Sequence, residues 1–121
     1  MANTFKVISF AAEPNSAGTA YKMYTVAGST TTVVLGLILT NIHSTAVTVE
    51  VELVSNTASR GGDNDVTNTT SFLVKDVSIP AGSSLELLSG GKVVLETTDE
   101  IKIDCSVADK VSGTLSIMEI T

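Results

Sequence analysis

The sequence is poor in the residue types on which many enzyme sites and disulfide-rich scaffolds depend. Its 121 residues include one cysteine, one histidine, two prolines and no tryptophan. The single cysteine, Cys105, excludes an internal disulfide framework and a zinc site built from several thiolates, and His43 alone cannot supply a cluster of imidazole ligands. The fold must therefore be stabilised by the burial of side chains.

Positive charge is also scarce. Seven basic and 13 acidic side chains give a formal net charge of −6 at pH 7, the wrong sign for a protein that neutralises phosphate groups. We therefore expect no nucleic-acid partner. No apolar run approaches the roughly 18 residues of a membrane span, and the first ten residues lack the apolar segment of a signal peptide. We expect no membrane partner, and synthesis in a cytosol without a cleaved export signal.

Motifs of catalysis and nucleotide binding are missing as well. The sequence contains no G-x-S-x-G, no G-x-x-x-x-G-K-[ST] and no G-x-G-x-x-G. His43 lies beside Ser44 and Thr45, but a catalytic histidine also needs an orienting partner and a pocket. The sequence therefore predicts no enzyme, no catalytic residue and no cofactor.

One acidic segment partly matches a metal-binding loop. Asp63, Asp65 and Thr67 alternate as at the start of an oxygen-lined calcium loop. An EF-hand loop also needs glycine at its sixth position and an acid at its twelfth, where this chain has Asn68 and Val74. We interpret the segment as a solvated acidic turn and predict no metal site.

β-Branched and hydroxyl side chains dominate what is present. The chain has 15 Val, 17 Thr and 14 Ser, together 46 of 121 residues, and β-branched side chains fit a pleated sheet. Apolar residues alternate with polar ones along 47–53 and again along 101–107. This alternation predicts strands with one wet face, and it places Cys105 among the inward-facing side chains as a small buried hydrophobe.

Strand-like sequence recurs from one end of the chain to the other. The segments are 5–10, 21–26, 31–40, 47–53, 71–77, 84–88, 92–96, 101–107 and 111–120. Helical periodicity with caps is not found, nor is an internal repeat. The prediction is an all-β protein: a single-domain antiparallel β-sandwich over residues 1–121, jelly-roll or immunoglobulin-like, with eight or nine short strands.

The connections carry turn signals. We expect a hairpin where loop 41–46 joins the strands 31–40 and 47–53, and a second tight hairpin at Ser89-Gly90-Gly91. Ile79-Pro80-Ala81-Gly82 predicts a type I turn with Pro80 in its second position. In the segment 31–40, Gly36 predicts a bulge or a close approach of another backbone.

The segment 31–40 is apolar on both faces, with Val34 and Ile38 sharing one of them. This pattern predicts a strand covered on two sides, inside the sandwich or at a subunit contact. A second unusual segment, 55–70, is a long polar loop, either solvated or functional. Tyr21 and Tyr24 suit either a half-buried interface or the edge of the core. The candidate interaction residues are Tyr21, Tyr24, Val34, Ile38, His43, Arg60, Asp63 and Asp65.

The last third of the chain, from Ile79 to Thr121, carries three short motifs. The first is a Pro-Gly turn leading into a strand, the second a hairpin, and the third a closing strand. Their residues are Pro80, Gly82, Ser83, Ser84 and Leu85; Val94, Leu95, Glu96, Asp99 and Ile101; and Ser116, Glu119, Ile120 and Thr121. On these motifs the sequence resembles the small all-β virion structural proteins of tailed bacteriophages, especially those of marine phages.

The resemblance implies a non-enzymatic virion protein present in many copies, which decorates or stabilises the capsid. The alternative is a component of the neck, tail or fibre. It implies partners among the major capsid or neck and tail proteins, copies of the protein itself, and a place in virions assembled in the host cytoplasm. The segment 31–40 and the two terminal strands are the expected contacts. A glycan- or receptor-binding sandwich using loop 55–70 stays open as a function of another class.

Overall fold

The computed structural model describes residues 2–61, 67–88 and 90–121. These residues form nine strands and no helix, hence no helix that could cross a membrane. The strands are β1 (Asn3–Glu13), β2 (Tyr21–Thr25), β3 (Thr31–Asn41), β4 (Val47–Val54), β5 (Ser71–Ile79), β6 (Ser84–Leu87), β7 (Val93–Leu95), β8 (Glu100–Cys105) and β9 (Val111–Ile120). Each lies on a segment that alternation predicted, so the all-β class and the strand count are confirmed.

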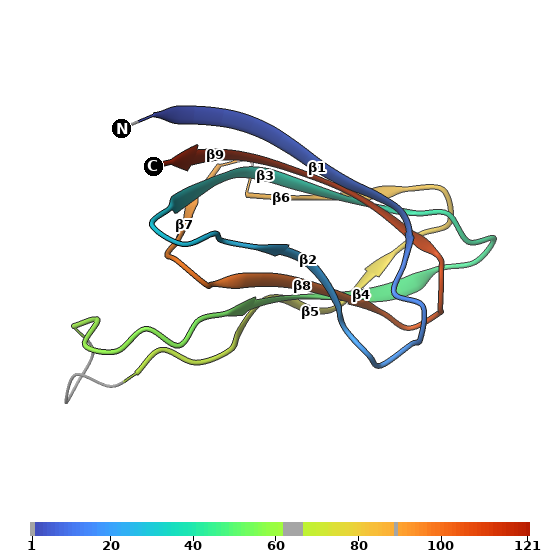
Figure 1. The fold of residues 1–121 in the computed structure, drawn as a ribbon. Helices are drawn as coiled ribbons and strands as arrows, with labels where there is room; N and C mark the ends of the chain where they lie inside the picture. Colours follow the sequence, from blue (N-terminus) through green and yellow to red (C-terminus); the bar gives the residue numbers. More distant parts are fainter. Residues whose placement is uncertain (1, 62–66, 89) are drawn as a thin grey trace.

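Two antiparallel sheets face each other (Figure 1). The first, here the β1 sheet, has the order β1-β9-β3-β6, with β7 also paired to β3; the second, the β2 sheet, has the order β2-β8-β4-β5. β6 pairs with residues 37–40 of β3 and β7 pairs with residues 32–34. β6 and β7 are therefore two pieces of one interrupted edge strand.

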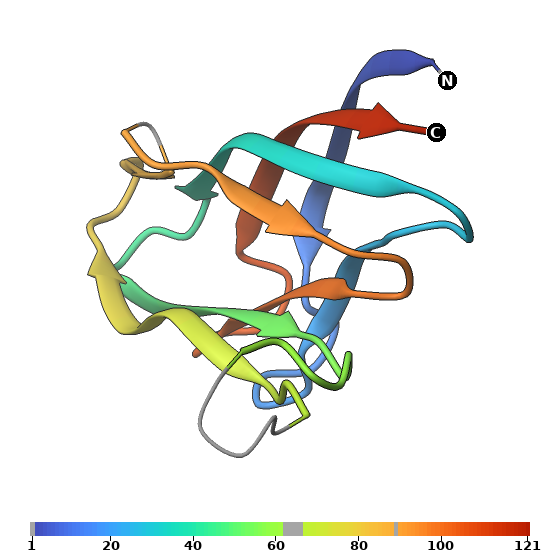
Figure 2. The ribbon, with the colours of Figure 1, turned by 90° about the vertical axis from the view of Figure 1, so that its left-hand side faces the viewer.

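With β6 and β7 counted as one strand, every connection but β4–β5 crosses from one sheet to the other. Figure 2, which looks at the end where both termini lie, shows these crossings around the core. The two interleaved four-strand sheets are those of a jelly roll. Of the two predicted topologies, the jelly-roll arrangement is the one that the strand order matches.

Loop 42–46 does not close the predicted hairpin. β3 pairs with β9, β6 and β7, whereas β4 pairs with β5 and β8, so the loop crosses between the sheets. Asn41 fixes this crossing: its side-chain amide donates to the carbonyls of Thr45 and Ile79, both at 2.9 Å, and its Oδ1 accepts the backbone N–H of His43 at 2.7 Å. The hairpin prediction was wrong because alternation identifies neighbouring strands without saying to which sheet each belongs.

Two further turn predictions were also wrong. β6 and β7 both pair with β3 and not with each other, so the Gly90-Gly91 segment makes no hairpin; Ser89 lies outside the described residues. At Pro80 the turn begins one residue later than predicted, since the N–H of Ser83 donates to the Pro80 carbonyl at 3.1 Å. Gly82 then occupies the third position with φ of 71°, which makes the turn type II.

The bulge predicted at Gly36 is confirmed, and it changes which side of β3 faces the core. The register with β9 shifts between Val34 and Gly36. Val34 is buried before the shift and Leu37 and Leu39 are buried after it, whereas Ile38 points outward and is 41% exposed. The prediction that Val34 and Ile38 share a face was therefore wrong, because the extra residue reverses the alternation.

The core lies between the two sheets. The β1 sheet contributes Leu37, Leu39, Leu115 and Ile117, and the β2 sheet contributes Val49, Val51, Ile101 and Ile103. Cys105, at the end of β8, is 3% exposed, which confirms its prediction as a buried hydrophobe. β4 and β8 each keep one partly exposed polar face, as their alternation predicted.

Candidate interaction surfaces

The outer face of the β2 sheet is charged. Lys75 Nζ lies 2.8 Å from Glu50 Oε1, and Lys22 Nζ lies 3.2 Å from Glu100 Oε2. The hydrogen bond to Glu50 raises the pKa of Lys75, because it stabilises the charged ammonium. This face has the character of an ordinary solvated surface.

One end of the outer face of the β1 sheet is apolar. Phe5 on β1 is the direct partner of Met118 on β9, Met118 of Val33 on β3, and Val33 of Val94 on β7. Directly opposed residues of neighbouring strands project from the same face. We call these four residues the apolar row. Phe5 is 71% exposed and Val94 58%, and Val7 beside Phe5 is 67% exposed.

A polar cluster lies on the inner side of the same strands. The Tyr24 hydroxyl donates to Glu119 Oε2 at 2.6 Å and is bonded to Thr32 Oγ1 at 2.8 Å, while Lys6 Nζ lies 2.7 Å from Glu119 Oε1. Burial, reinforced by Glu119, raises the pKa of Tyr24 to about 12. The hydrogen bonds from Lys6 and Tyr24 lower the pKa of Glu119. The cluster ties β2 to β9 and β9 to β1, and Tyr24 itself is buried.

The other described candidates are spread over the molecule. Tyr21 begins β2, with its ring edge-on to Phe10 at a centroid distance of 5.1 Å. His43 is half-buried in the loop between β3 and β4, and Val34 is fully buried in the core. Ile38 lies on the outer face of the β1 sheet, with Glu86 as its partner on β6. The structure therefore does not bring these candidates into one surface, and a contact at Tyr21, Ile38 or His43 stays a prediction.

Loop 55–70 is described only in part. The Nε–H of Arg60 donates to Glu96 Oε2 at 3.0 Å, and both residues line an open hollow of about 350 Å³ with Thr31, Thr57 and Thr97. Asp63 and Asp65, and with them the segment compared to a calcium loop, lie outside the described residues. Ligand binding by this loop stays a prediction.

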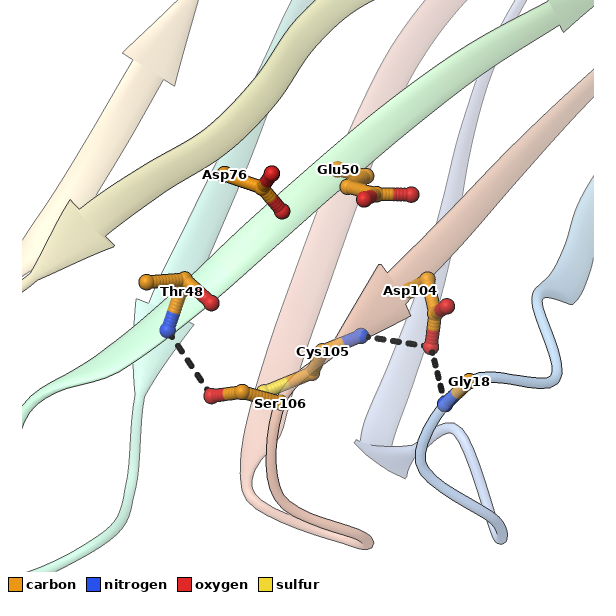
Figure 3. Close-up of a pocket in the computed structure, with 7 residues that line it drawn as sticks. All are labelled: Gly18, Thr48, Glu50, Asp76, Asp104, Cys105 and Ser106. Carbon is orange, nitrogen blue, oxygen red and sulfur yellow. Dashed lines mark hydrogen bonds between the residues drawn. The ribbon is translucent and has the colours of Figure 1, made fainter.

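Figure 3 shows a second hollow, of about 200 Å³, at the end of the β2 sheet. Asp104 Oδ1 accepts the N–H of Gly18 at 3.1 Å and that of Cys105 at 2.8 Å, which anchors the β1–β2 loop to the end of β8. Glu50 and Asp76 also line the hollow. In the described ranges, no group of three or more His, Cys, Asp or Glu is placed to hold a metal ion. Asp104 therefore has a structural task in this hollow.

Sequence reasoning missed the apolar row as a unit. It indicated the two terminal strands as contacts but named no residue on them. A row across four strands depends on register, and the sequence does not show the partner of each residue. The available signal was that Phe5 and Val7 share one face of their segment while Ile8 and Phe10 share the other.

No protein-family model matches the sequence, and a search of curated proteins finds no match. Solved structures are similar in fold. One is a crystal structure of the T13 IBDV viral particle. The match covers 97% of this chain and 30% of the viral chain, with 11% identity and a TM-score of 0.55. The VP2 subviral particle of infectious bursal disease virus matches 96% of this chain and 32% of its own, with 14% identity and a TM-score of 0.52.

A third structure, from the endospore appendages of Bacillus, which form disulfide-linked pili, matches 99% of this chain and 87% of its own, with 17% identity and a TM-score of 0.47. The chain spans about a third of the length of the viral chains that it matches. At these identities the two viral likenesses are likenesses of fold.

Proposed function

We propose that this protein is a non-enzymatic structural protein of a tailed-phage virion, present in many copies and decorating the capsid. The observation that carries the proposal is the apolar row on the outer face of the β1 sheet, with Val7 beside it. Exposed apolar side chains that gather on one face, while the opposite face is charged, mark a surface for contact with another protein.

The sequence motifs, the fold and the net charge also support the proposal. The motifs from Ile79 to Thr121 resemble those of small phage virion proteins, and this resemblance supports a phage as the kind of particle. The jelly-roll fold occurs in the chains of assembled viral particles, and it buries a core without disulfides or metal. A net charge of −6 also disfavours adhesion to nucleic acid released around assembling particles.

Particle composition tests the proposal. Mass spectrometry of purified virions should detect the protein in many copies, and an image reconstruction should place its density on the capsid, with the β1 sheet against its neighbour. Density at the neck, tail or fibre would contradict the decoration role. Absence of the protein from the particles would contradict the proposal as a whole.

The apolar row can be tested with one charge. Val94→Asp should lower the occupancy of the protein on particles by at least about tenfold, because an unpaired carboxylate is costly to bury in an apolar contact. Ile42→Asp is the matched control: Ile42 is 49% exposed, close to Val94 at 58%, but lies in the loop beyond β3 and outside the row. Equal occupancy of the two variants would mean that the apolar row is not the contact surface.

A further inference from the structure

The four sheet edges differ in how well they are protected. The β6/β7 edge is interrupted, and its pieces are four and three residues long. β2 has five residues and a register shift between Lys22 and Tyr24. β5 is irregular against β4, and Asp76 within it has φ of 52°. Short strands, bulges and charges at an edge discourage pairing with another chain.

The edge formed by β1 has none of these protections over most of its length. β1 has 11 residues and pairs with β9 without a shift from Asn3 to Phe10. Its other side pairs with no strand of the described residues, and β1 forms the upper border of the ribbon in Figure 1. Lys6 is its one charge before Glu13. A long, regular and weakly charged edge is a template for strand addition.

The register identifies the backbone groups that this edge presents. Ala2 and Thr121 exchange two backbone hydrogen bonds, of 3.2 and 3.0 Å. Along an antiparallel pair, such hydrogen-bonded pairs alternate with pairs that are not bonded. From Ala2 onward the even-numbered residues therefore bond to β9, and the N–H and C=O groups of Asn3, Phe5, Val7 and Ser9 point to the free edge.

We propose that the free edge of β1 pairs with the same edge of a second copy, antiparallel about a two-fold axis at Val7. The β1 sheets of the two copies then form one continuous sheet, with both apolar rows on the same face. The inference names a partner within the proposed function, although its test needs only the purified protein.

Charge favours this register over the adjacent one, and hydrogen bonding is compatible with it. If Phe5 faced the partner's Val7, the two Lys6 side chains would lie opposite each other at the axis, a repulsive arrangement. With Val7 facing the partner's Val7, Phe5 pairs with the partner's Ser9, and Lys6 faces the partner's Ile8. Each of the pairs at Phe5, Val7 and Ser9 can exchange two backbone hydrogen bonds.

Charge also favours a second copy as the occupant. Each copy carries a net charge of −6, so most contacts between copies are repulsive. Residues 3–12 of β1 contain Lys6 and no acidic residue, and that lysine is already paired with Glu119 at 2.7 Å. This edge therefore lets two acidic molecules approach each other with little local repulsion.

Sedimentation equilibrium of the purified chain tests the pairing. We expect a reversible dimer, and Val7→Pro should raise its dissociation constant by at least about tenfold, because two symmetry-related hydrogen bonds are lost. The N–H of Val7 faces solvent in the single chain, so proline there spares the pairing with β9. Val7→Thr keeps the N–H and the side-chain shape, and it is the matched control. Equal dissociation constants for the two variants would overturn the proposal.

Cysteine cross-linking tests the register and does not depend on the folding of the proline variant. Val7→Cys should form a disulfide-linked dimer under mild oxidation, since opposed residues of a hydrogen-bonded pair lie about 5.5 Å apart at Cα. Phe5→Cys, equally exposed, should cross-link at least about tenfold more slowly, because its sulfur faces the partner's Ser9. The native Cys105 is buried and should not react.

Faster cross-linking at position 5, or a monomer at every concentration, would overturn the self-pairing. A monomer that is nevertheless abundant in virions would overturn the self-pairing and leave the proposed function standing. A dimer of a protein that is absent from virions would support the self-pairing and overturn the proposed function.

Discussion

Gly113 on β9 has no room for a side chain, because a phenyl ring covers it. Phe10 is its direct partner on β1, and a Cβ built on Gly113 would lie 2.3 Å from Phe10 Cε2 and 2.5 Å from Cζ. The ring in turn packs edge-on against Tyr21 of the other sheet, at an interplanar angle of 64°. Any side chain at Gly113 must therefore displace an aromatic contact between the two sheets.

Gly113→Ala should accordingly lower the free energy of unfolding by about 1–3 kcal/mol, the usual cost of overpacking. Gly36→Ala is the matched control in the adjacent strand, since no atom lies within 4 Å of the added Cβ. Urea unfolding with an unchanged slope would measure both. If the two variants had equal stability, Phe10 would not be the constraint on Gly113.

The cluster of Lys6, Glu119 and Tyr24 predicts a loss of stability at both ends of the pH scale. The pKa of Tyr24 is raised to about 12 in the folded chain, so its contribution is complete below the ordinary value of 10 and is lost between pH 10 and about 12. The pKa of Glu119 is lowered, so its contribution is present above 4.5 and is lost as the pH falls through the lowered value.

Urea unfolding of the wild type and Tyr24→Phe across this pH range would check the assignment. The variant leaves the buried Thr32 hydroxyl without this partner, which should cost about 1–2 kcal/mol at neutral pH. The difference in the free energy of unfolding between the variant and the wild type should shrink above pH 10. The folded wild type must then keep the Tyr24 hydroxyl protonated, whereas the variant has no hydroxyl to protonate. A constant deficit up to pH 12 would contradict the role of Tyr24.

At the level of strands, sequence alternation predicted where each element lies, because one face of most strands repeats a buried position every second residue. Val47, Val49 and Val51 are all at most 1% exposed, as their alternation required. Alternation failed to predict which strands pair. The hydrogen bonds of Asn41 to Ile79 and of Asp104 to Gly18 join residues far apart in the chain, and nothing local encodes them.

The surface residues were harder to predict than the strands. Tyr24 was a candidate because its ring suits an interface or the edge of the core, and Val34 because its segment is apolar on both faces. Both are buried, at 8% and 0% exposure. For Val34 the cause is the bulge, whose effect on the alternation depends on pairing with β9. Strand register decides which apolar side chains face outward. For this reason Val94 and Met118 could be identified as surface residues only from the structure.

β9 is the element on which the β1 sheet most depends. It lies between β1 and β3, and Leu115 and Ile117 are fully buried. Deleting residues 117–121 should lower the free energy of unfolding by several kcal/mol. The deletion removes the buried side chain of Ile117 and the end of the pairing of β9 with β1 and β3.

The single change Ile117→Ala should cost about 2–5 kcal/mol, and Ile42→Ala, at a position that is 49% exposed, much less. Thermal melting monitored by circular dichroism would measure all three variants. Near-wild-type melting of the deletion variant would contradict the central place of β9.

The whole molecule has two unlike faces. One sheet turns an apolar row outward, and the other turns outward a set of paired charges that include Glu50 with Lys75 and Lys22 with Glu100. Under the proposed function, a molecule of this kind attaches through the β1 sheet and turns the charged face of the β2 sheet toward solvent. The expected difference between Val94→Asp and Ile42→Asp therefore tests which face of the molecule is attached.

The pairing of the first and last strands also determines how the chain responds to force. Ala2 and Thr121 are bonded to each other at one end of the sandwich, and β1 and β9 run antiparallel from there. A load that pulls the two termini apart therefore acts on one backbone pair at a time, as in opening a zipper. A load between the termini and the far end of the sandwich instead strains many pairs together. The molecule is thus mechanically weak along one direction and strong along another.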